Sequence, residues 1–495
     1  MLDLLDLPRW LLELIFVAYA LVIAGTVMLE RRRPTSTLAW ILAMVFLPLL
    51  GLIAYLLVGR RRVRKRIRLR ERRPLRPLEQ TRQIAAIGDI DDIDALPHLQ
   101  RGLVKLALRT TKTPLRHAHE VQIFSRPGDA FESMEATIRG AKRSICLEFY
   151  IWRADATGKR WIDLLVERAR AGIKVRLLYD DFGSLGTRRE FFDPLRNAGG
   201  EVRAFGPLRL RLRPHQSRIN FRNHRKILTV DGETGFLGGL NIADEYAGAG
   251  RPWQDLHVCL RGDAVFGLDA IFLEDWLGAQ PPGAIDLSDP GCLRELGLEE
   301  LYARECNGST GPLVQVIPSG PDNPSSYTLA SQFTAAISVA QDRCWITTPY
   351  FVPDEPLLLA MTTAALRGVD LRILVPSAAN SDSRLVSLAS QAYYDDLLAV
   401  GCRIFEYQPG MIHSKCMIVD DQIAAIGSAN MDIRSFYLNY EVTAMFYDSA
   451  VTEQLAAIFL KHIENAEEQS AAGRVDLGLG QRLAEGFAKV LSPLL

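Results

Sequence analysis

Two stretches of the chain carry the same four polar residues at the same spacing. In each stretch a lysine follows a histidine by two residues, an aspartate follows it by seven, and an asparagine follows it by 17. The first set is His224, Lys226, Asp231 and Asn241, and the second is His413, Lys415, Asp420 and Asn430. Residues two apart in a strand point to the same side, so each histidine should lie beside its lysine. An imidazole next to an ammonium group suits chemistry at a phosphate.

Two such pairs around one pocket would form a complete site for phosphoryl transfer. The lysines would neutralise the phosphate oxygens, and Asn241, Asn430 and Ser428 could add neutral donors. One histidine would attack phosphorus, and the other would protonate the leaving alkoxide. The chain contains 10 Lys against 48 Arg, yet both motifs keep lysine, which indicates a need for a compact charge. The scheme needs no cofactor and no metal, and we expect neither.

A nucleophilic imidazole must keep one nitrogen unprotonated, so its other nitrogen needs a partner that fixes the tautomer. Two downstream acids have suitable positions. Asp255 follows His224 by 31 residues, and Glu441 follows His413 by 28 residues. Each acid is expected to orient the histidine that precedes it. Asp231 and Asp420 complete the repeated motif and so join the histidines and lysines as catalytic candidates, but their positions near strand ends favour a role in fixing the turn.

The repeat extends beyond these motifs. Residues 169–178 and 365–374 each form a helix end, a glycine and an apolar strand, position for position. Upstream of each lies a strand that ends in an aromatic residue, at 146–150 and 345–350. Helix, glycine stop and buried strand are the parts of a β-α-β unit. The sequence therefore predicts an α/β body of two duplicated domains, each a mixed sheet flanked by helices, related by a pseudo-two-fold axis.

Two apolar runs precede the body, at residues 11–29 and 38–58. Each is about long enough to cross a bilayer as a helix, which predicts an N-terminal transmembrane helical hairpin. Eleven Lys and Arg residues between positions 60 and 76 should hold the body on the cytoplasmic side of the cell membrane. Pro48 and Gly51 interrupt the second run, so a re-entrant segment is an alternative to a full span.

These patterns divide the chain of 495 residues into four expected parts. They are the membrane hairpin at 1–59, a basic linker with connecting helices at 60–115, the first duplicated domain at 116–290, and the second at 291–495 with a C-terminal helix. Residues 285–310 are expected to connect the two domains.

Composition excludes several classes of protein. With 48% hydrophobic and 23% charged residues, the chain is neither disordered nor a small disulfide-stapled protein. Its net charge of zero combines a head of +10 over residues 1–76 with a body of −10. An acidic body argues against a nucleic-acid partner, whereas a basic head beside apolar runs suggests anionic lipid. The seven scattered cysteines indicate neither a disulfide framework nor a zinc site.

Two further segments admit more than one interpretation. Residues 208–213 alternate leucine and arginine, which fits either an exposed hairpin strand or a strand resting on acidic headgroups. Near the C-terminus Leu483, Phe487, Val490 and Leu491 have helical spacing. We expect them to pack into the core rather than to form a second lipid-binding helix.

Taken together, the motifs resemble those of the phospholipase D superfamily, whose hallmark is a pair of H-x-K-x-x-x-x-D motifs. Around them the chain is similar to the bacterial cardiolipin synthase family, and the N-terminal runs resemble the membrane hairpin of that family. The resembling segments are 222–226, 238–243, 319–321, 348–353, 411–413, 430–432, 434–435, Asn439 with Glu441, and, in the head, residues 39–55.

The resemblance implies transphosphatidylation at the cell inner membrane. His224 would attack one phosphatidylglycerol to give a phosphatidyl-histidine, and His413 would protonate the departing glycerol. His413 would then activate a hydroxyl of a second phosphatidylglycerol, and the product would be cardiolipin. Anionic membrane lipids are the expected partners, and self-association is left open. The alternatives are hydrolysis of phospholipids by the same residues, a nuclease of the same superfamily, and a scaffold, which the intact motifs disfavour.

Overall fold

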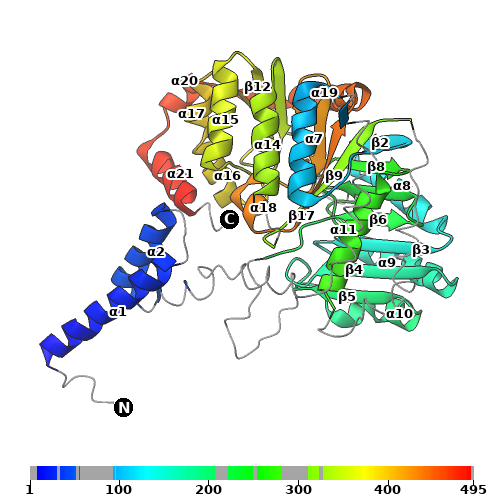
Figure 1. Cartoon of the computed structure of the whole chain (residues 1–495), viewed down its shortest axis with the longest axis horizontal. Helices are drawn as coiled ribbons and strands as arrows, with labels where there is room; N and C mark the ends of the chain where they lie inside the picture. Colours follow the sequence, from blue (N-terminus) through cyan, green and yellow to red (C-terminus); the bar gives the residue numbers. More distant parts are fainter. Residues whose placement is uncertain are drawn as a thin grey trace. The chain divides into compact units, whose positions relative to one another are not determined.

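The computed structural model describes residues 8–29, 34–48, 50–51, 55, 93–94, 96–206, 221–248, 253–280, 310–322 and 327–491 (Figure 1). The chain divides into two compact units, one with the N-terminal helices and one with the duplicated body. The basic cluster at 60–76, the alternating segment at 208–213 and the expected connector, apart from residue 310, lie outside the described residues. So do the expected boundaries at 59/60 and 290/291.

The N-terminal unit contains two apolar helices, α1 (Arg9–Leu29) and α2 (Pro34–Phe46). They pack through a small cluster of Ile23, Val27, Met44 and Tyr55. Helix α2 ends two residues before Pro48, in line with the effect of proline on the residues before it. Within the described ranges, no helix has the length and apolar character required to span a membrane. The transmembrane hairpin stays a prediction.

Within the described residues, the first half of the body is a seven-stranded sheet in the order β2-β8-β7-β6-β3-β4-β5. Strands β3, β4 and β5 are parallel, and the others add in antiparallel fashion. The strands are β2 (Glu120–Phe124), β3 (Ser144–Phe149), β4 (Lys174–Asp180), β5 (Glu201–Phe205), β6 (Ile227–Val230), β7 (Thr234–Gly238) and β8 (His257–Arg261). The helices are α8 (Pro127–Arg139), α9 (Ala156–Arg170), the short η2 (Arg189–Phe192) and α10 (Asp193–Asn197), and α11 (Val265–Gly278).

The second half repeats this order as β9-β17-β15-β14-β10-β12-β13, with β1 and β18 added at the two edges. The strands are β1 (Arg116–His117), β9 (Leu313–Ser319), β10 (Arg343–Thr347), β12 (Asp370–Pro376), β13 (Arg403–Tyr407), β14 (Cys416–Val419), β15 (Ile423–Gly427), β17 (Glu441–Tyr447) and β18 (Ala466–Gln469), with the pair β11 (Phe351–Val352) and β16 (Met431–Asp432) apart from them. The helices are α14 (Thr328–Val339), α15 (Glu355–Leu366), α16 (Arg384–Gln391), α17 (Tyr394–Leu398), α18 (Ile433–Tyr437), α19 (Ser449–Ile463), α20 (Ala471–Val475) and α21 (Leu479–Leu491). The predicted α/β duplication is confirmed.

The repeated β-α-β units form as their sequences predict. Asp155 and Asp354 cap the N-termini of α9 and α15 by accepting a backbone N–H bond three residues on. Gly172 and Gly368 follow these helices with φ of +85° and +94°, a region that favours glycine. The chain then enters β4 and β12.

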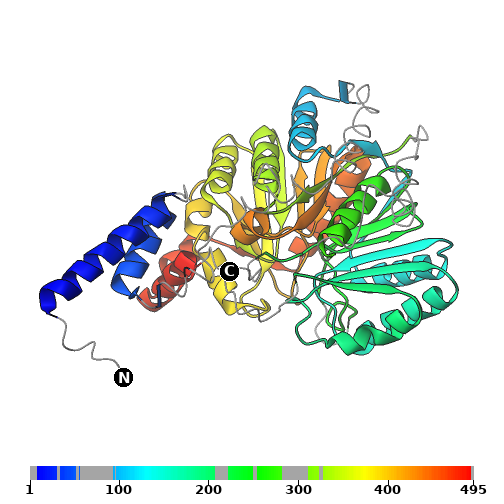
Figure 2. The same ribbon diagram turned by 60° about the horizontal axis from the view of Figure 1, so that its bottom comes forward.

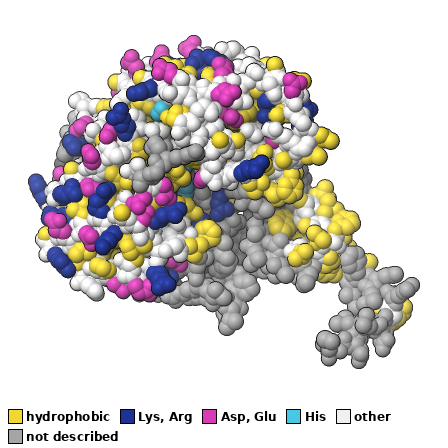
Figure 3. All heavy atoms as spheres, turned by 180° about the vertical axis from the view of Figure 1, so that it is seen from behind, with side chains coloured by type: hydrophobic (Ala, Val, Ile, Leu, Met, Phe, Trp, Pro, Cys, Tyr) yellow, Lys and Arg dark blue, Asp and Glu magenta, His cyan; other side chains and the backbone are white. Residues whose placement is uncertain are grey.

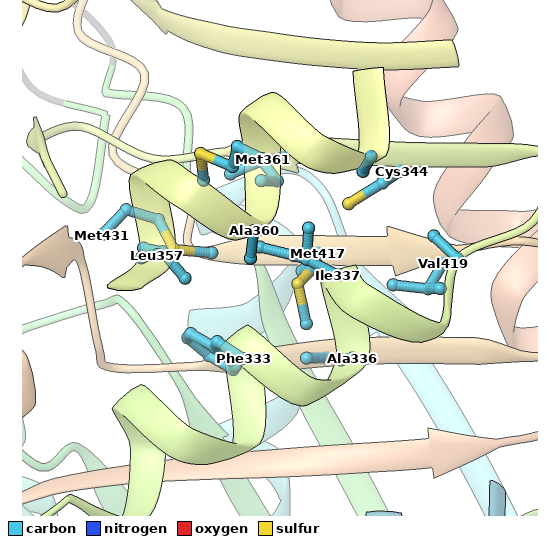
Figure 4. Packing of buried hydrophobic residues seen from close by; sticks show 14 of the residues in the cluster. Phe333, Ala336, Ile337, Cys344, Leu357, Ala360, Met361, Met417, Val419 and Met431 are labelled. Atoms are coloured by element: carbon cyan, nitrogen blue, oxygen red, sulfur yellow. The ribbon is translucent and has the colours of Figure 1, made fainter. Parts of the chain in front are cut away.

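Apolar strands build the core of each half. Every residue of β6 and β14 is buried, and the helices lie over the sheets. In the second half, α14 and α15 lie over β14, and Phe333, Ile337, Leu357, Met417 and Val419 belong to one hydrophobic cluster (Figure 4). These strands therefore hold the segments before them, which carry the two histidines, on a rigid support.

The two halves also share a core. Figure 2 shows the sheets of the two halves next to one another. Strands β7 and β15 contact one another, and a single cluster joins Leu237 and Val258 of the first half to Ile426 and Ala444 of the second. Because apolar side chains of both sheets pack in one shared cluster, the two halves form one compact body rather than two separate domains.

Two expectations about the ends of the domains are wrong. Strand β1, expected at the start of the first domain, pairs with β9 of the second sheet, and α7 (His98–Thr111), expected among the connecting helices, packs on α14 and β9. Of the four apolar residues expected in the core, Leu483, Phe487 and Val490 lie on the outward face of α21 and are exposed, whereas Leu491 is half-buried. Helix α21 is held instead through its other face, where Glu485 and Ala488 are buried.

Candidate active site

Each histidine lies on an extended segment just before a central strand, His224 ahead of β6 and His413 ahead of β14. These segments cross to the other half through two short parallel bridges. The bridged pairs are Asn223 with Tyr440 and Gln254 with Ile412. The backbone N–H of His224 donates to the Tyr440 carbonyl at 2.9 Å, and that of His413 donates to the Gln254 carbonyl at 2.6 Å. Each histidine is thus fixed against the segment that enters a strand of the opposite half, β17 for His224 and β8 for His413.

The bridges decide which acid meets which histidine. Nδ1 of His224 lies 3.0 Å from both carboxylate oxygens of Glu441, and Nδ1 of His413 lies 2.7 Å from Oδ2 of Asp255. The expectation that each acid orients the histidine of its own half is therefore wrong. Chain spacing suggested partners within one half, whereas the bridges place each acid one residue beyond a contact with the other half.

Burial sets the protonation of the two histidines. It lowers the pKa of His224 to about 4, although the charge of Glu441 opposes the shift. Burial, with Lys415 and Lys226 nearby, lowers the pKa of His413 well below its usual value. His224 is the more accessible, with 12% of its side chain exposed against 5% for His413. Both shifts favour the neutral imidazole over the imidazolium.

The two lysines complete the expected convergence. Lys226 Nζ donates to the carbonyl of His224 at 2.6 Å, and Lys415 Nζ donates to the carbonyl of His413. Burial lowers the pKa of Lys226 to about 7 and that of Lys415 to about 8. Lys226 acts on the pKa of His413, and Lys415 acts on that of His224. The structure therefore brings both pairs into one site.

The two acids have different surroundings. Burial raises the pKa of Asp255 to about 6. Burial also acts to raise that of Glu441, but His224 and Lys226 outweigh it and the net direction is down. Glu441 additionally accepts a hydrogen bond from the Ser428 hydroxyl. At the equivalent position the first half has Gly239, where a Cβ would overlap the Asp255 carboxylate.

The two asparagines lie on the loops that follow β7 and β15. Asn241 is buried, accepts the Ile151 backbone N–H at 3.0 Å and donates to the Tyr246 hydroxyl at 2.8 Å. Asn430 is also buried, and its side-chain oxygen has no hydrogen-bond partner among the described residues. Asn241 thus has contacts that tie its loop together, whereas Asn430 keeps an oxygen unpaired.

Asp231 and Asp420 lie outside the candidate site. They stand seven residues beyond the histidines, roughly 20 Å along an extended chain, at the far ends of β6 and β14. Both have positive φ, +55° and +50°. The Asp231 carboxylate accepts backbone N–H bonds from residues 142–144, and the Asp420 carboxylate does so from residues 341–343. These contacts agree with the role of fixing a turn.

One buried residue at the site had no role assigned from the sequence. Arg225, between His224 and Lys226, donates to the carbonyls of Glu441 and Ser319, each at 3.0 Å, and pairs with Asp275 of α11. Its counterpart in the second half is Ser414. This difference between the two otherwise matching motifs was the feature of the sequence that could have indicated a special role for Arg225.

Aromatic rings flank both imidazoles. The ring of Tyr150 lies 4.8 Å from that of His224, and the rings of Trp253 and Tyr246 lie 5.1 and 5.6 Å from that of His413. These rings exclude water from the sides of the imidazoles and account for much of their burial. Within the described ranges, no cluster of three or more His, Cys, Asp or Glu has the arrangement of a metal site.

Two family models match the chain. One, described as "Cardiolipin synthase, PLD-like domain", matches residues 134–259 and 333–463, and the other, "Phospholipase_D-nuclease N-terminal", matches residues 14–60. The duplicated sheets and the paired histidine and lysine motifs thus define a phospholipase D-like protein.

Curated relatives narrow this class. The chain is 38% identical over 477 residues to a cardiolipin synthase of Geobacillus sp. (strain WCH70), covering 96% of this chain and 91% of the relative. It is 37% identical over 479 residues to a cardiolipin synthase of Geobacillus kaustophilus, with the same coverage. The chain therefore belongs to the cardiolipin synthase family. The crystal structure of a phosphatidylserine synthase from Haemophilus influenzae matches with a TM-score of 0.59 at 16% identity, over 80% of this chain and 100% of that one, which supports the fold alone.

Proposed function

We propose that the protein makes cardiolipin from two molecules of phosphatidylglycerol and releases glycerol. The observation that carries this proposal is the single site in which two histidines, each held by a carboxylate of the opposite half, meet two buried lysines. Such a site offers a nucleophile, an acid/base and fixed positive charge for one phosphodiester. Membership in the cardiolipin synthase family supports the choice of lipid.

The contacts of the two imidazoles support different roles for them. An ionised Glu441 accepts Nδ1–H of His224, which leaves the lone pair on Nε2 for attack on phosphorus. Nδ1 of His413 faces Oδ2 of Asp255 at 2.7 Å, so a protonated His413 would donate Nδ1–H to that carboxylate and present Nε2–H to the leaving group. His224 is accordingly the proposed nucleophile, and His413 is the proposed acid and base.

The reaction then proceeds in two balanced steps. Nε2 of His224 bonds to phosphorus, the bond from phosphorus to the glycerol oxygen breaks, and His413 supplies the proton that glycerol carries away. A hydroxyl of the second phosphatidylglycerol next gives its proton to His413 and bonds to phosphorus, and His224 leaves. Binding of the phosphodiester anion beside the lysines offsets the charges that lower the pKa of His413, and so prepares it to carry the first proton.

We place the protein at the cell inner membrane, with residues 11–58 as the anchor and the body on the cytoplasmic side. The apolar helices α1 and α2, the match of residues 14–60 and the basic residues at 60–76 support this arrangement. On the face of the body in Figure 3, Lys and Arg side chains are interspersed with Asp and Glu side chains. A mixed surface of this kind gives little support to a nucleic-acid partner.

Thin-layer chromatography of the products from purified protein and phosphatidylglycerol alone tests the proposal. Cardiolipin and glycerol should appear in equal amounts, and His224→Ala or His413→Ala should each abolish both. Phosphatidic acid as the main product would instead establish a hydrolase that uses the same residues. Retention of more than about a hundredth of the activity by either variant would contradict the shared site.

A further inference from the structure

The C-terminal helix α21 presents its apolar face to the outside. Four side chains at helical spacing, Leu479, Leu483, Phe487 and Val490, are 65 to 76% exposed, and Val475 of α20 extends the row at 70%. On an isolated surface helix these side chains would be expected to face the core. Here they form one continuous stripe, which we call the α21 stripe.

The inward face of α21 combines a buried ion pair with Ala488, which packs into the core of the second half. Glu485, only 4% exposed, accepts from Arg474 at 2.7 Å, and Arg474 also pairs with Asp395 of α17. Lys489 adds a contact between its Nζ and the Tyr393 ring, 4.3 Å from the centroid. A buried ion pair therefore fixes the rotation of the helix, and it does so with the apolar stripe outward.

Basic residues border the stripe on one side. On a helical projection, Arg482 and Lys489 fall together between the α21 stripe and the inward face, and the Lys489 ammonium also donates to the Ala392 carbonyl at 3.3 Å and lies 4.0 Å from Asp396. Arg482 is exposed and donates to the Val475 carbonyl at 2.9 Å. An apolar face bordered by arginine and lysine is the pattern of a helix that lies in the interface of a membrane with anionic lipid.

The position of α21 connects it to the candidate active site. Helix α21 packs along α16, which begins directly after the loop at 377–383. In that loop Asp382 accepts a hydrogen bond from the Tyr350 hydroxyl at 2.6 Å and acts on the pKa of Lys415. The α21 stripe thus lies on the helix next to the rim of the site.

We propose that the α21 stripe rests in the interface of an anionic bilayer and holds the rim of the active site at the depth of the lipid phosphates. This proposal rests on the proposed function, since it assumes that the substrates are bilayer lipids. Four observations support the proposal: the exposed apolar stripe, the buried ion pair that fixes the rotation of α21, the basic residues beside the stripe, and the packing of α21 on the helix that follows the loop at 377–383.

The direct test is photolabelling of the full-length protein in nanodiscs of equimolar phosphatidylglycerol and phosphatidylethanolamine. A trace phosphatidylglycerol with a diazirine in its acyl chain is activated by light, and labelled peptides are identified by mass spectrometry. We expect label on Leu483 and Phe487. Leu366 is similarly exposed, at 70%, but it precedes β12 and so lies at the opposite end of that strand from the loop at 377–383; it should carry no label. Absence of label on α21, or a crosslink showing that the hairpin or a second copy covers it, would overturn the proposal.

A kinetic comparison separates this inference from the proposed function. Leu483→Ser with Phe487→Ser should raise the apparent KM for phosphatidylglycerol in vesicles about tenfold, because the site is no longer held at the bilayer. The same variant should act normally on a short-chain phosphatidylglycerol dissolved as monomers. Leu366→Ser should change neither value. Equal loss on both substrates would contradict a docking role, and failure of the wild type on both would instead contradict the proposed function.

Discussion

At the scale of single residues, the crossed acids are the main feature of the site. Glu441 reaches His224 and Asp255 reaches His413, so each half supplies the carboxylate that its partner needs. All four residues could be found in the sequence because their types and spacing repeat. Their pairing could not, since separations of 31 and 28 residues do not tell whether a segment stays in its own half or crosses to the other.

The lysines predict a pH dependence. In the free enzyme Lys226 and Lys415 lose their charge as the pH rises through about 7 and about 8, because burial lowers both pKa values. Positive charge is needed to bind the phosphodiester, so kcat/KM should fall above these values. The bound phosphate anion stabilises both ammonium groups, so kcat should fall only at higher pH.

Initial rates over a range of lipid concentrations at each pH check this prediction. Lys226→Arg supplies a matched control, because arginine stays charged and should remove the step near pH 7 even if overall activity drops. A kcat/KM that stays level well past both pKa values would contradict the proposed role of the lysines.

At the scale of elements, the motif aspartates hold turns. The carboxylates of Asp231 and Asp420 each accept hydrogen bonds from three consecutive backbone N–H groups, and both residues have positive φ. The motif made them candidates for catalysis, and their positions near strand ends already pointed to the turn. The structure supplies what the sequence lacked, namely the neighbouring loops at 142–144 and 341–343 that deliver the N–H groups.

Asp231→Ala should therefore destabilise the fold with little effect on chemistry. Three backbone N–H donors lose a charged acceptor, two of them exposed and that of Ser144 half-buried, which costs about 1–3 kcal/mol. Urea unfolding measures the loss, and kcat of the folded protein at low temperature should remain near the wild-type value. Asp231→Asn, which tolerates positive φ, should lose less stability. If the kcat of Asp231→Ala were as low as that of His224→Ala, Asp231 would have to be a catalytic residue after all.

Arg225 joins elements of both halves. Its guanidinium binds the carbonyls of Glu441 and Ser319 and the carboxylate of Asp275, and it is almost fully buried. By holding the first residue of β17, it also holds the acid that orients His224. The sequence marked this residue only through its replacement by Ser414 in the other half.

Arg225→Gln should cost about 3–5 kcal/mol, because Asp275 is left buried without its charge partner. Thermal and urea unfolding should show this loss, and the folded fraction should also have a reduced kcat because Glu441 is less firmly placed. Arg261→Gln removes an exposed pair with Glu120 and should cost no more than about 1 kcal/mol. Similar losses for the two variants would contradict the structural role given to Arg225.

At the scale of the whole molecule, duplication explains why the catalytic groups come in pairs and why neither half suffices. The sequence predicted two α/β domains correctly. It misplaced β1 and α7, because a two-residue strand and a helix after a linker carry no mark of which sheet they will join. It also missed the outward face of α21, because helical spacing shows that an apolar face exists but not what it contacts.

Separately expressed halves, residues 1–290 and 291–495, should each be inactive. Each would keep a histidine and a lysine but lose the carboxylate that fixes its imidazole, together with the shared apolar core. Cardiolipin formation by either half alone, measured with labelled phosphatidylglycerol, would show that a single motif is enough.

The crossed arrangement is tested most directly by rapid quench of a single turnover with a phosphatidyl donor whose leaving group needs no protonation. Mass spectrometry of the quenched protein locates the phosphatidyl adduct and gives its rate of formation. We predict an adduct on His224 whose formation is slowed by Glu441→Gln, by up to about 10⁴-fold if the effect equals that of the same change in a Ser-His-Asp triad. Asp255→Asn should leave that rate nearly unchanged and slow only the transfer to the second lipid. An adduct on His413 would contradict the role given to His224. A rate of adduct formation that depends on Asp255 and not on Glu441 would contradict the crossed pairing of acids and histidines.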